Sequence, residues 1–174
     1  RIASYLDPDH IDAVLLTARL LDDLDQFELA TEAYDRVPRD DASFHAAELG
    51  RAEALRRAGQ VDRAIEVLTA LSQSHDHLSI VHTTLGDTLR REERFAEATT
   101  AYDRAIALFG APNASQWAVY FSRGITHERE DRWPEAEADF RKALELRPDQ
   151  PQVLNYLGYS LVEVLVPPLG FRSR

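Results

Sequence analysis

The sequence predicts an all-α protein in which antiparallel helix pairs stack into a solenoid. An alanine followed four residues later by an aromatic residue or leucine recurs at intervals of 34, 34 and 38 residues. These alanines are Ala30, Ala64, Ala98 and Ala136. A small residue stands twelve positions before each of them, at Ala18, Ala52, Gly86 and Gly124. Self-similarity at a fixed period of this length is the signature of a stacked repeat array.

Within each repeat the pattern predicts two helices separated by a short polar turn. The expected helices span residues 11–23, 27–37, 43–58, 61–74, 78–91, 95–109, 115–130, 134–147 and 151–165. Polar residues at 57–60 and 91–94 separate the two helices of a pair. Pro134 falls in the first turn of its helix, where the missing N–H costs nothing, and Pro148 closes that helix. Four extra residues around Gly110 lengthen the last interval.

The same residues resemble the tetratricopeptide repeat (TPR) family. The family pattern is visible in Leu154-x2-Leu157-Gly158-x2-Leu161, and in the alanine–aromatic lines that precede it. The resemblance covers the chain to about Glu163. It implies a right-handed α-solenoid, the TPR superhelix, in which the first helix of every repeat lines a concave groove. It also implies protein binding as the function.

The register divides the chain into a partial repeat, four complete repeats and a last helix. We expect TPR 1 at 10–43, TPR 2 at 44–77, TPR 3 with its four-residue insertion at 78–115, TPR 4 at 116–149, and the first helix of TPR 5 at 150–165. Pro8 takes the position of a closing proline, so residues 1–9 are expected to end a preceding repeat. Residues 166–174 contain two prolines and no apolar period, and are expected to be an irregular, non-native tail.

These ends predict a fragment of a longer bacterial TPR array, because the last helix is too apolar for a solvent-facing cap. The alternative is that this apolar end is a docking or self-association surface, carried by Leu161, Val164 and Leu165.

The composition excludes several classes of function. The chain has 30 acidic and 20 basic residues, a net charge of −10, which disfavours nucleic acid as the main partner. It has no cysteine, no HExxH motif and no glycine-rich phosphate loop, and His75, His77 and His82 lack the spacing of a zinc site. We therefore expect no metal, no cofactor and no enzymatic activity. Its apolar stretches are far shorter than the roughly 20 residues of a membrane span, which predicts a soluble protein without membrane insertion, of the bacterial cytoplasm or periplasm.

The resemblance places the binding residues on the first helices. The groove-facing positions of the first three repeats carry charged residues of both signs, whereas those of the fourth and fifth repeats offer aromatic and aliphatic side chains. We expect Phe121, Ile125, Tyr156, Tyr159 and Asn155 to anchor a peptide or partner, with Arg90 and Arg19 as polar contacts. The alternative for Phe121 is that the superhelical twist packs it against the neighbouring first helix.

One TPR subclass can be compared residue by residue. Co-chaperone TPR domains hold a C-terminal carboxylate with Lys and Asn from one first helix, Asn from the next, and Lys and Arg from the third. The matching slots here hold Leu15 and Arg19, then Gly50, then Ile80 and Thr84, and the other frames fit no better. We expect no carboxylate clamp of the chaperone type.

The sequence thus predicts a scaffold or adaptor that binds a peptide or partner domain in the groove of a TPR array. A structural or oligomerisation module that uses the apolar C-terminal helix is one alternative, and a regulatory domain of a larger protein is another. His127 takes a position that is leucine in the other repeats. We expect it to be half-buried and hydrogen-bonded within the core.

Overall fold

The structure, a computed structural model, describes residues 10–165, with side chains described through Gly158. This range contains nine α-helices, one short 3-10 helix and no strand. The helices are α2 (Ile11–Asp23), α3 (Phe27–Asp35), α4 (Phe44–Arg57), α5 (Val61–Ser74), α6 (Ser79–Arg91), α7 (Phe95–Ala107), η1 (Ala114–Gln116), α8 (Trp117–Arg129), α9 (Trp133–Leu146) and α10 (Pro151–Leu165). The expectations for residues 1–9 and 166–174 lie outside the described residues.

The helices lie where the sequence places them, and their ends differ by two residues at most. The expected helix 27–37 stops at Asp35, because the residue before Pro38 is biased away from the helical region. The insertion ends in a capping box, in which the Asn113 side chain accepts from Ser115 N–H at 2.9 Å and the Asn113 N–H donates to Gln116. This box starts η1, which leads directly into α8.

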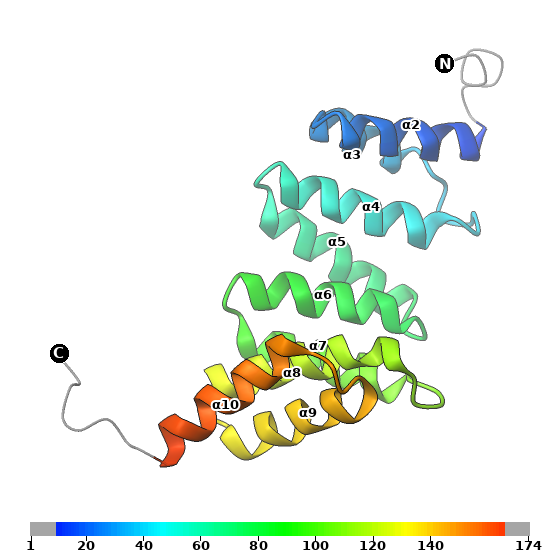
Figure 1. Ribbon diagram of the computed structural model, residues 1–174. Helices are drawn as coiled ribbons and strands as arrows, with labels where there is room; N and C mark the ends of the chain where they lie inside the picture. Colours follow the sequence, from blue (N-terminus) through cyan, green and yellow to red (C-terminus); the bar gives the residue numbers. More distant parts are fainter. Residues whose placement is uncertain (1–9, 166–174) are drawn as a thin grey trace.

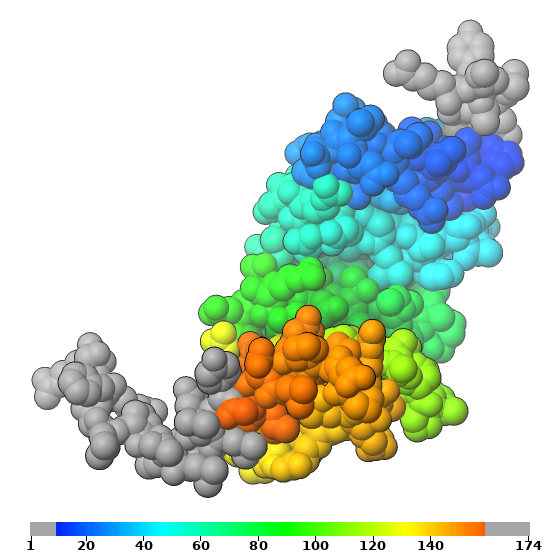
Figure 2. All heavy atoms as spheres, in the orientation of Figure 1, coloured from blue at the N-terminus to red at the C-terminus, as the bar shows by residue number. Residues whose placement is uncertain are grey.

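Each helix packs against the next one along the chain, and the pairs stack in chain order from α2 at one end to α10 at the other (Figure 1). The space-filling view shows the same order as successive layers (Figure 2). In such an array each repeat contacts only its neighbours and is placed like the one before it. The first helices of successive pairs therefore lie side by side and form one continuous face of the solenoid.

The first helix of each complete pair ends in the same left-handed turn. The residues with positive φ are Asp25 (57°), Gly59 (76°), Glu93 (57°) and Asp131 (59°). After each of them the chain donates back to the helix, as where Gln60 N–H bonds the Leu55 carbonyl at 2.8 Å. This hydrogen bond satisfies a carbonyl at the helix end and directs the chain into the second helix.

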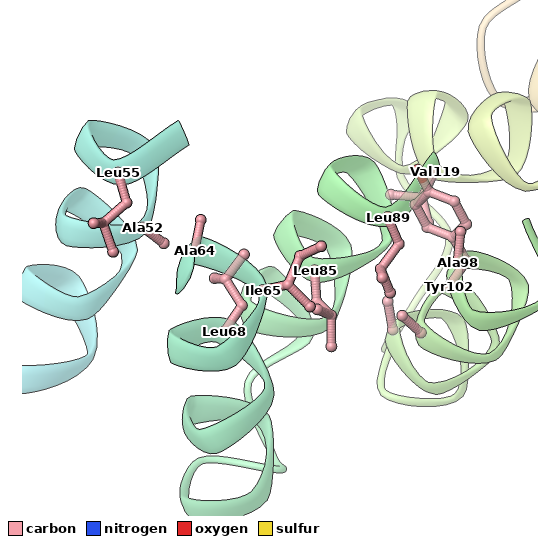
Figure 3. Close-up of a cluster of buried hydrophobic side chains, with 12 residues drawn as sticks. Ala52, Leu55, Ala64, Ile65, Leu68, Leu85, Leu89, Ala98, Tyr102 and Val119 are labelled. Carbon is pink, nitrogen blue, oxygen red and sulfur yellow. The ribbon is translucent and has the colours of Figure 1, made fainter. Parts of the chain in front are cut away.

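The repeated alanines and small residues form the core between the helices. The four repeated alanines and the rings of Tyr102 and Phe140 have no measurable exposure. A Cβ at Gly86 would lie 2.7 Å from Tyr102 Cε1, and a Cβ at Gly124 would lie 2.5 Å from Phe140 Cε1. The small position therefore accommodates the aromatic ring of the second helix. Figure 3 shows how such side chains from α4 to α8 fill the space between successive helices.

Candidate functional site

The predicted groove residues belong to the first helices α2, α6, α8 and α10. We call the face that α2, α4, α6, α8 and α10 are expected to share the first-helix face. Each of its first three helices carries at least one charge that is already paired. On α4 the Arg56 guanidinium bonds Glu53 at 2.6 Å, and this hydrogen bond lowers the pKa of Glu53. A ligand that used these charges would have to compete with an existing ion pair, which limits their contribution to affinity.

Arg19 and Arg90, the two predicted polar contacts, each lie beside a buried tyrosine. Arg90 Nε donates to the Tyr102 hydroxyl at 3.3 Å, and that hydroxyl donates to Asp87 Oδ1 at 2.7 Å. Burial, followed by the negative charge of Asp87, raises the pKa of Tyr102. Arg19 is exposed on α2 and faces Tyr34, where burial raises the pKa of the hydroxyl and Arg19 lowers it. Both guanidinium groups are thus held by the fold.

The C-terminal part of the first-helix face is aromatic. Phe121 on α8 stacks on Trp117, with ring centroids 6.0 Å apart, and meets Tyr156 of α10 edge-on at 5.4 Å. Behind it lies the buried ring of Phe140, 5.9 Å from both Phe121 and Tyr156. Edge-on and offset rings are the favourable aromatic geometries. We call Trp117, Phe121 and Tyr156 the aromatic patch.

Within the aromatic patch, exposure differs from ring to ring. Phe121 is half-buried and packs against Tyr156 of the neighbouring first helix. This is the contact expected if the superhelical twist turns Phe121 towards that helix instead of into an open groove. Tyr156 keeps 36% of its surface exposed, and Asn155 beside it is exposed as well. Ile125 is half-buried in the same apolar cluster. The structure therefore brings Phe121, Ile125 and Tyr156 together, whereas Arg19 and Arg90 lie outside this cluster on α2 and α6.

Four predicted side chains cannot be placed. Tyr159, Leu161, Val164 and Leu165 belong to α10, but their side chains lie outside the described residues.

A partly buried ion-pair network between α7, α8 and α9 was not predicted. Arg123 Nε and Nη2 bond the Asp139 carboxylate at 2.8 and 2.7 Å, and Nη1 bonds Asp103 at 2.6 Å. Burial opposes the charged form of Arg123, but the hydrogen bonds and charges of these carboxylates outweigh it and raise the pKa of Arg123. The bidentate geometry fixes α8 against α9. Arg123 also has a counterpart, Arg51 of α4, which pairs with Asp35 of α3.

His127 differs from its expected state. It is buried rather than half-buried, and its side chain forms no hydrogen bond within the described part of the chain: Nε2 lies 3.7 Å from Asp139, and Nδ1 has no partner. Burial lowers the pKa of His127, and Arg132 and Arg123 lower it further, against the opposing charge of Asp139. Asp139, the carboxylate nearest to His127 Nε2, is held by Arg123 through both of its oxygens.

Two other kinds of site, a metal centre and a membrane-spanning helix, find no geometric support in the described residues within 10–165. There, no three or more His, Cys, Asp or Glu side chains are grouped so as to hold a metal ion. Over the same range, every helix is too short or too polar to cross a membrane.

A family model of the tetratricopeptide repeat matches residues 15–75 and 83–159, well over half of the chain. The chain belongs to the tetratricopeptide repeat family. This membership agrees with the helix pairs and with the small residues that face aromatic rings. TPR proteins are generally scaffolds, and the family supports a role in protein–protein interaction.

Solved TPR structures share the fold at low sequence identity. YrrB, a TPR protein with an unusual peptide-binding site, has a TM-score of 0.69 and 15% identity over 88% of this chain and 77% of its own. The ArsTM double mutant of MamA RS-1 has a TM-score of 0.76 and 16% identity over 88% of this chain and 84% of its own. The first TPR domain of Spaghetti, bound to an HSP90 peptide, has a TM-score of 0.63 and 23% identity over 72% of this chain and 95% of its own.

Among curated proteins, the E3 ubiquitin-protein ligase CHIP of Arabidopsis thaliana is 33% identical over 78 residues. That match covers 45% of this chain and 27% of the relative, so the TPR chain spans about a quarter of the length of this relative.

Proposed function

We propose that this TPR chain is an interaction scaffold or adaptor that holds a peptide or partner domain on the first-helix face, anchored by the aromatic patch. The observation that supports this proposal is the arrangement of Phe121 and Tyr156, two rings that meet edge-on while Tyr156 stays 36% exposed. Rings held by their neighbours lose little conformational freedom on binding. Aromatic side chains of this kind dominate the affinity of many protein interfaces.

Around this anchor, Asn155 supplies amide hydrogen bonds and Ile125 extends the apolar floor. Tyr159 is included because the register places it one turn beyond Asn155. Arg90 and Arg19 serve as polar contacts: each guanidinium gives up its contact with a tyrosine hydroxyl and donates a hydrogen bond to an acceptor on the ligand instead. The peptide bound to Spaghetti and the peptide-binding site of YrrB support a peptide as the ligand class.

The ligand is not held through a chaperone-type carboxylate clamp. The clamp positions carry Gly50, Ile80 and Thr84 instead of the required amide and basic residues. Affinity would therefore come from side chains within the ligand rather than from its C-terminal carboxylate.

The test is quantitative affinity capture from the source organism's lysate with three forms of the chain. Phe121→Glu would place a charge in the core, so the binding variant is Tyr156→Ala/Asn155→Ala. The control is Leu29→Ala, which changes a 50% exposed residue on the second helix α3. Proteins retained by the wild type and the control but lost from the binding variant support the proposal. Equal capture by all three forms contradicts it.

Exposure on α10 also favours a second candidate, self-association through the C-terminal helix. Leu154 is 52% exposed there, and Leu161, Val164 and Leu165 continue the apolar pattern in the sequence. A dimer formed in this way would show a concentration-dependent mass in light scattering, and Leu165→Glu would return it to a monomer. A constant monomer mass rejects this candidate.

A further inference from the structure

A second groove lies between the second helices α5 and α7, with α6 as its floor, and has a volume of about 510 Å³. Ile65 and Thr69 line it from α5, Leu85 and Leu89 from α6, and Thr100 and Ala101 from α7. Figure 3 shows Ile65 beside Leu85, with Leu89 one turn further along α6. A concave, mainly apolar space of this size is typical of ligand sites.

This groove is separate from the first-helix face. At 3.6 residues per turn, Leu85 and Leu89 point away from Arg90, the predicted polar contact on α6. A partner in this groove would therefore leave the first-helix face open.

The gaps before and after this one along the solenoid are each crossed by an ion pair. The repeat register aligns Leu85 with Arg51, 34 residues earlier, and with Arg123, 38 residues later. Arg51 pairs with Asp35 of the preceding second helix, and Arg123 pairs in the same way with Asp103 at 2.6 Å.

In the middle gap, both members of this ion pair are replaced. The position of Asp35 and Asp103 is Thr69 on α5, and the arginine position is Leu85. The polar bridge between helices is thus exchanged for an apolar floor, and the space above that floor is open. Leu85 and Leu89 are themselves only 8% and 4% exposed, so an apolar side chain in the groove would cover the remaining surface of the lining residues rather than a large exposed leucine face.

The edge of the groove on α5 is acidic. Asp62 and Glu66, one turn apart, line a hollow that adjoins the groove and shares Ile65 and Thr69 with it. Neither carboxylate forms an ion pair with any residue in the described range. The two arginines that line the groove and the hollow, Arg104 and Arg94, are already paired, with Asp76 at 3.1 Å and with Glu97 at 2.6 Å. Two unpaired carboxylates beside an apolar floor complement a segment that carries basic residues next to apolar ones.

We propose that the groove between α5 and α7 docks a basic amphipathic helix of a partner protein. Apolar side chains of this helix contact Leu85 and Leu89, and its lysine or arginine side chains face Asp62 and Glu66. The lining residues of α5 and α7 recur at helical spacing over about two turns, roughly 10 Å, which matches two turns of a helix lying along them.

The test uses two synthetic 16-residue helical peptides that share one leucine face and differ only in carrying lysine or glutamate on its flanks. Binding is measured by fluorescence anisotropy at two salt concentrations. The lysine peptide is expected to bind at least about tenfold more tightly than the glutamate peptide, and to weaken as salt rises. Equal binding of the two peptides, or binding of neither, overturns the proposal.

The neighbouring repeats supply the variant that closes the groove. Thr69→Asp/Leu85→Arg installs the ion pair that crosses the adjacent gaps, and is expected to weaken the lysine peptide by at least about tenfold with unchanged circular dichroism. Ile80→Ser is the control, because Ile80 is 53% exposed on the opposite side of α6. An unchanged affinity in the closing variant, or an equal loss in the control, overturns the proposal.

A second variant keeps the test decisive if the closing variant unfolds. Thr69→Lys/Thr100→Lys changes two exposed positions and places positive charge in the groove. It is expected to weaken the lysine peptide and strengthen the glutamate peptide. No change in the ratio of the two affinities would show that the peptides bind elsewhere.

Discussion

In the repeats, a small residue of the first helix faces an aromatic ring of the second. Replacing this small residue changes the free energy of unfolding, and tertiary packing decides whether the change is a gain or a loss. Gly124→Ala would place a Cβ 2.5 Å from Cε1 of Phe140, a ring with no exposed surface that is enclosed by Phe121, Trp133 and Tyr156. Alanine gains about 1 kcal/mol over glycine in a helix interior. Forcing a buried ring aside costs about 1–3 kcal/mol, and the enclosure of Phe140 favours the upper half of that range. The expected net loss is about 1–2 kcal/mol.

Gly158→Ala is the matched control, since Gly158 takes the same position in the next repeat and has no atom within 4 Å of an added Cβ. There the helix propensity acts alone, and we expect a gain of roughly 0.5–1 kcal/mol. Urea unfolding followed by circular dichroism at 222 nm measures both variants against the wild type. If Gly124→Ala proved as stable as the wild type, the close approach of α8 to Phe140 would not be a real constraint.

Three further predictions concern charge and backbone strain. Burial lowers the pKa of His127 in the folded chain below its ordinary value near 6.5, so the unfolded chain takes up the proton first and the wild type loses stability as pH falls through about 6.5. His127→Leu should therefore lose less free energy of unfolding than the wild type between pH 7 and pH 5 in urea titrations, and parallel losses would contradict this. Arg123→Leu leaves the buried Asp139 without its bidentate partner and should cost about 3 kcal/mol, whereas Arg123→Leu/Asp139→Leu should recover most of it; a double variant no better than the single one would count against the pairing. Glu93 has φ 57°, so Glu93→Gly should raise the unfolding free energy by about 1 kcal/mol in thermal melts, and a loss would contradict strain at this turn.

Much of the fold could be predicted because its determinants are local and repeated. The spacing of Ala30, Ala64, Ala98 and Ala136 set the register, and the register placed every described helix within two residues. Among the left-handed turns, only the one at Gly59 was indicated by its residue type in the sequence, because glycine favours positive φ. At Asp25, Glu93 and Asp131 the same conformation is imposed on residues that do not favour it, because the packed helices on either side determine the path of the chain.

The candidate site was less predictable. The register grouped Phe121, Ile125 and Tyr156 as one predicted anchor, but the exposure of each ring depends on contacts between α8, α9 and α10. The Arg123 network left a signal in the sequence, since Arg51 and Arg123 share one register position and Asp35 and Asp103 share another. That signal acquires a meaning only when the two positions are known to face each other across successive helices.

The sequence alone determined the helices, their order and the family, because a repeating pattern of small and bulky residues specifies which faces are buried. The tertiary structure alone decided how deeply Phe121 and His127 are buried, and which arginines cross between helices. It also decided that the gap floored by Leu85 stays open. These properties depend on residues about half a repeat to one repeat apart that meet only when the helices pack. Local periodicity carries no information about which side chain fills the space between them.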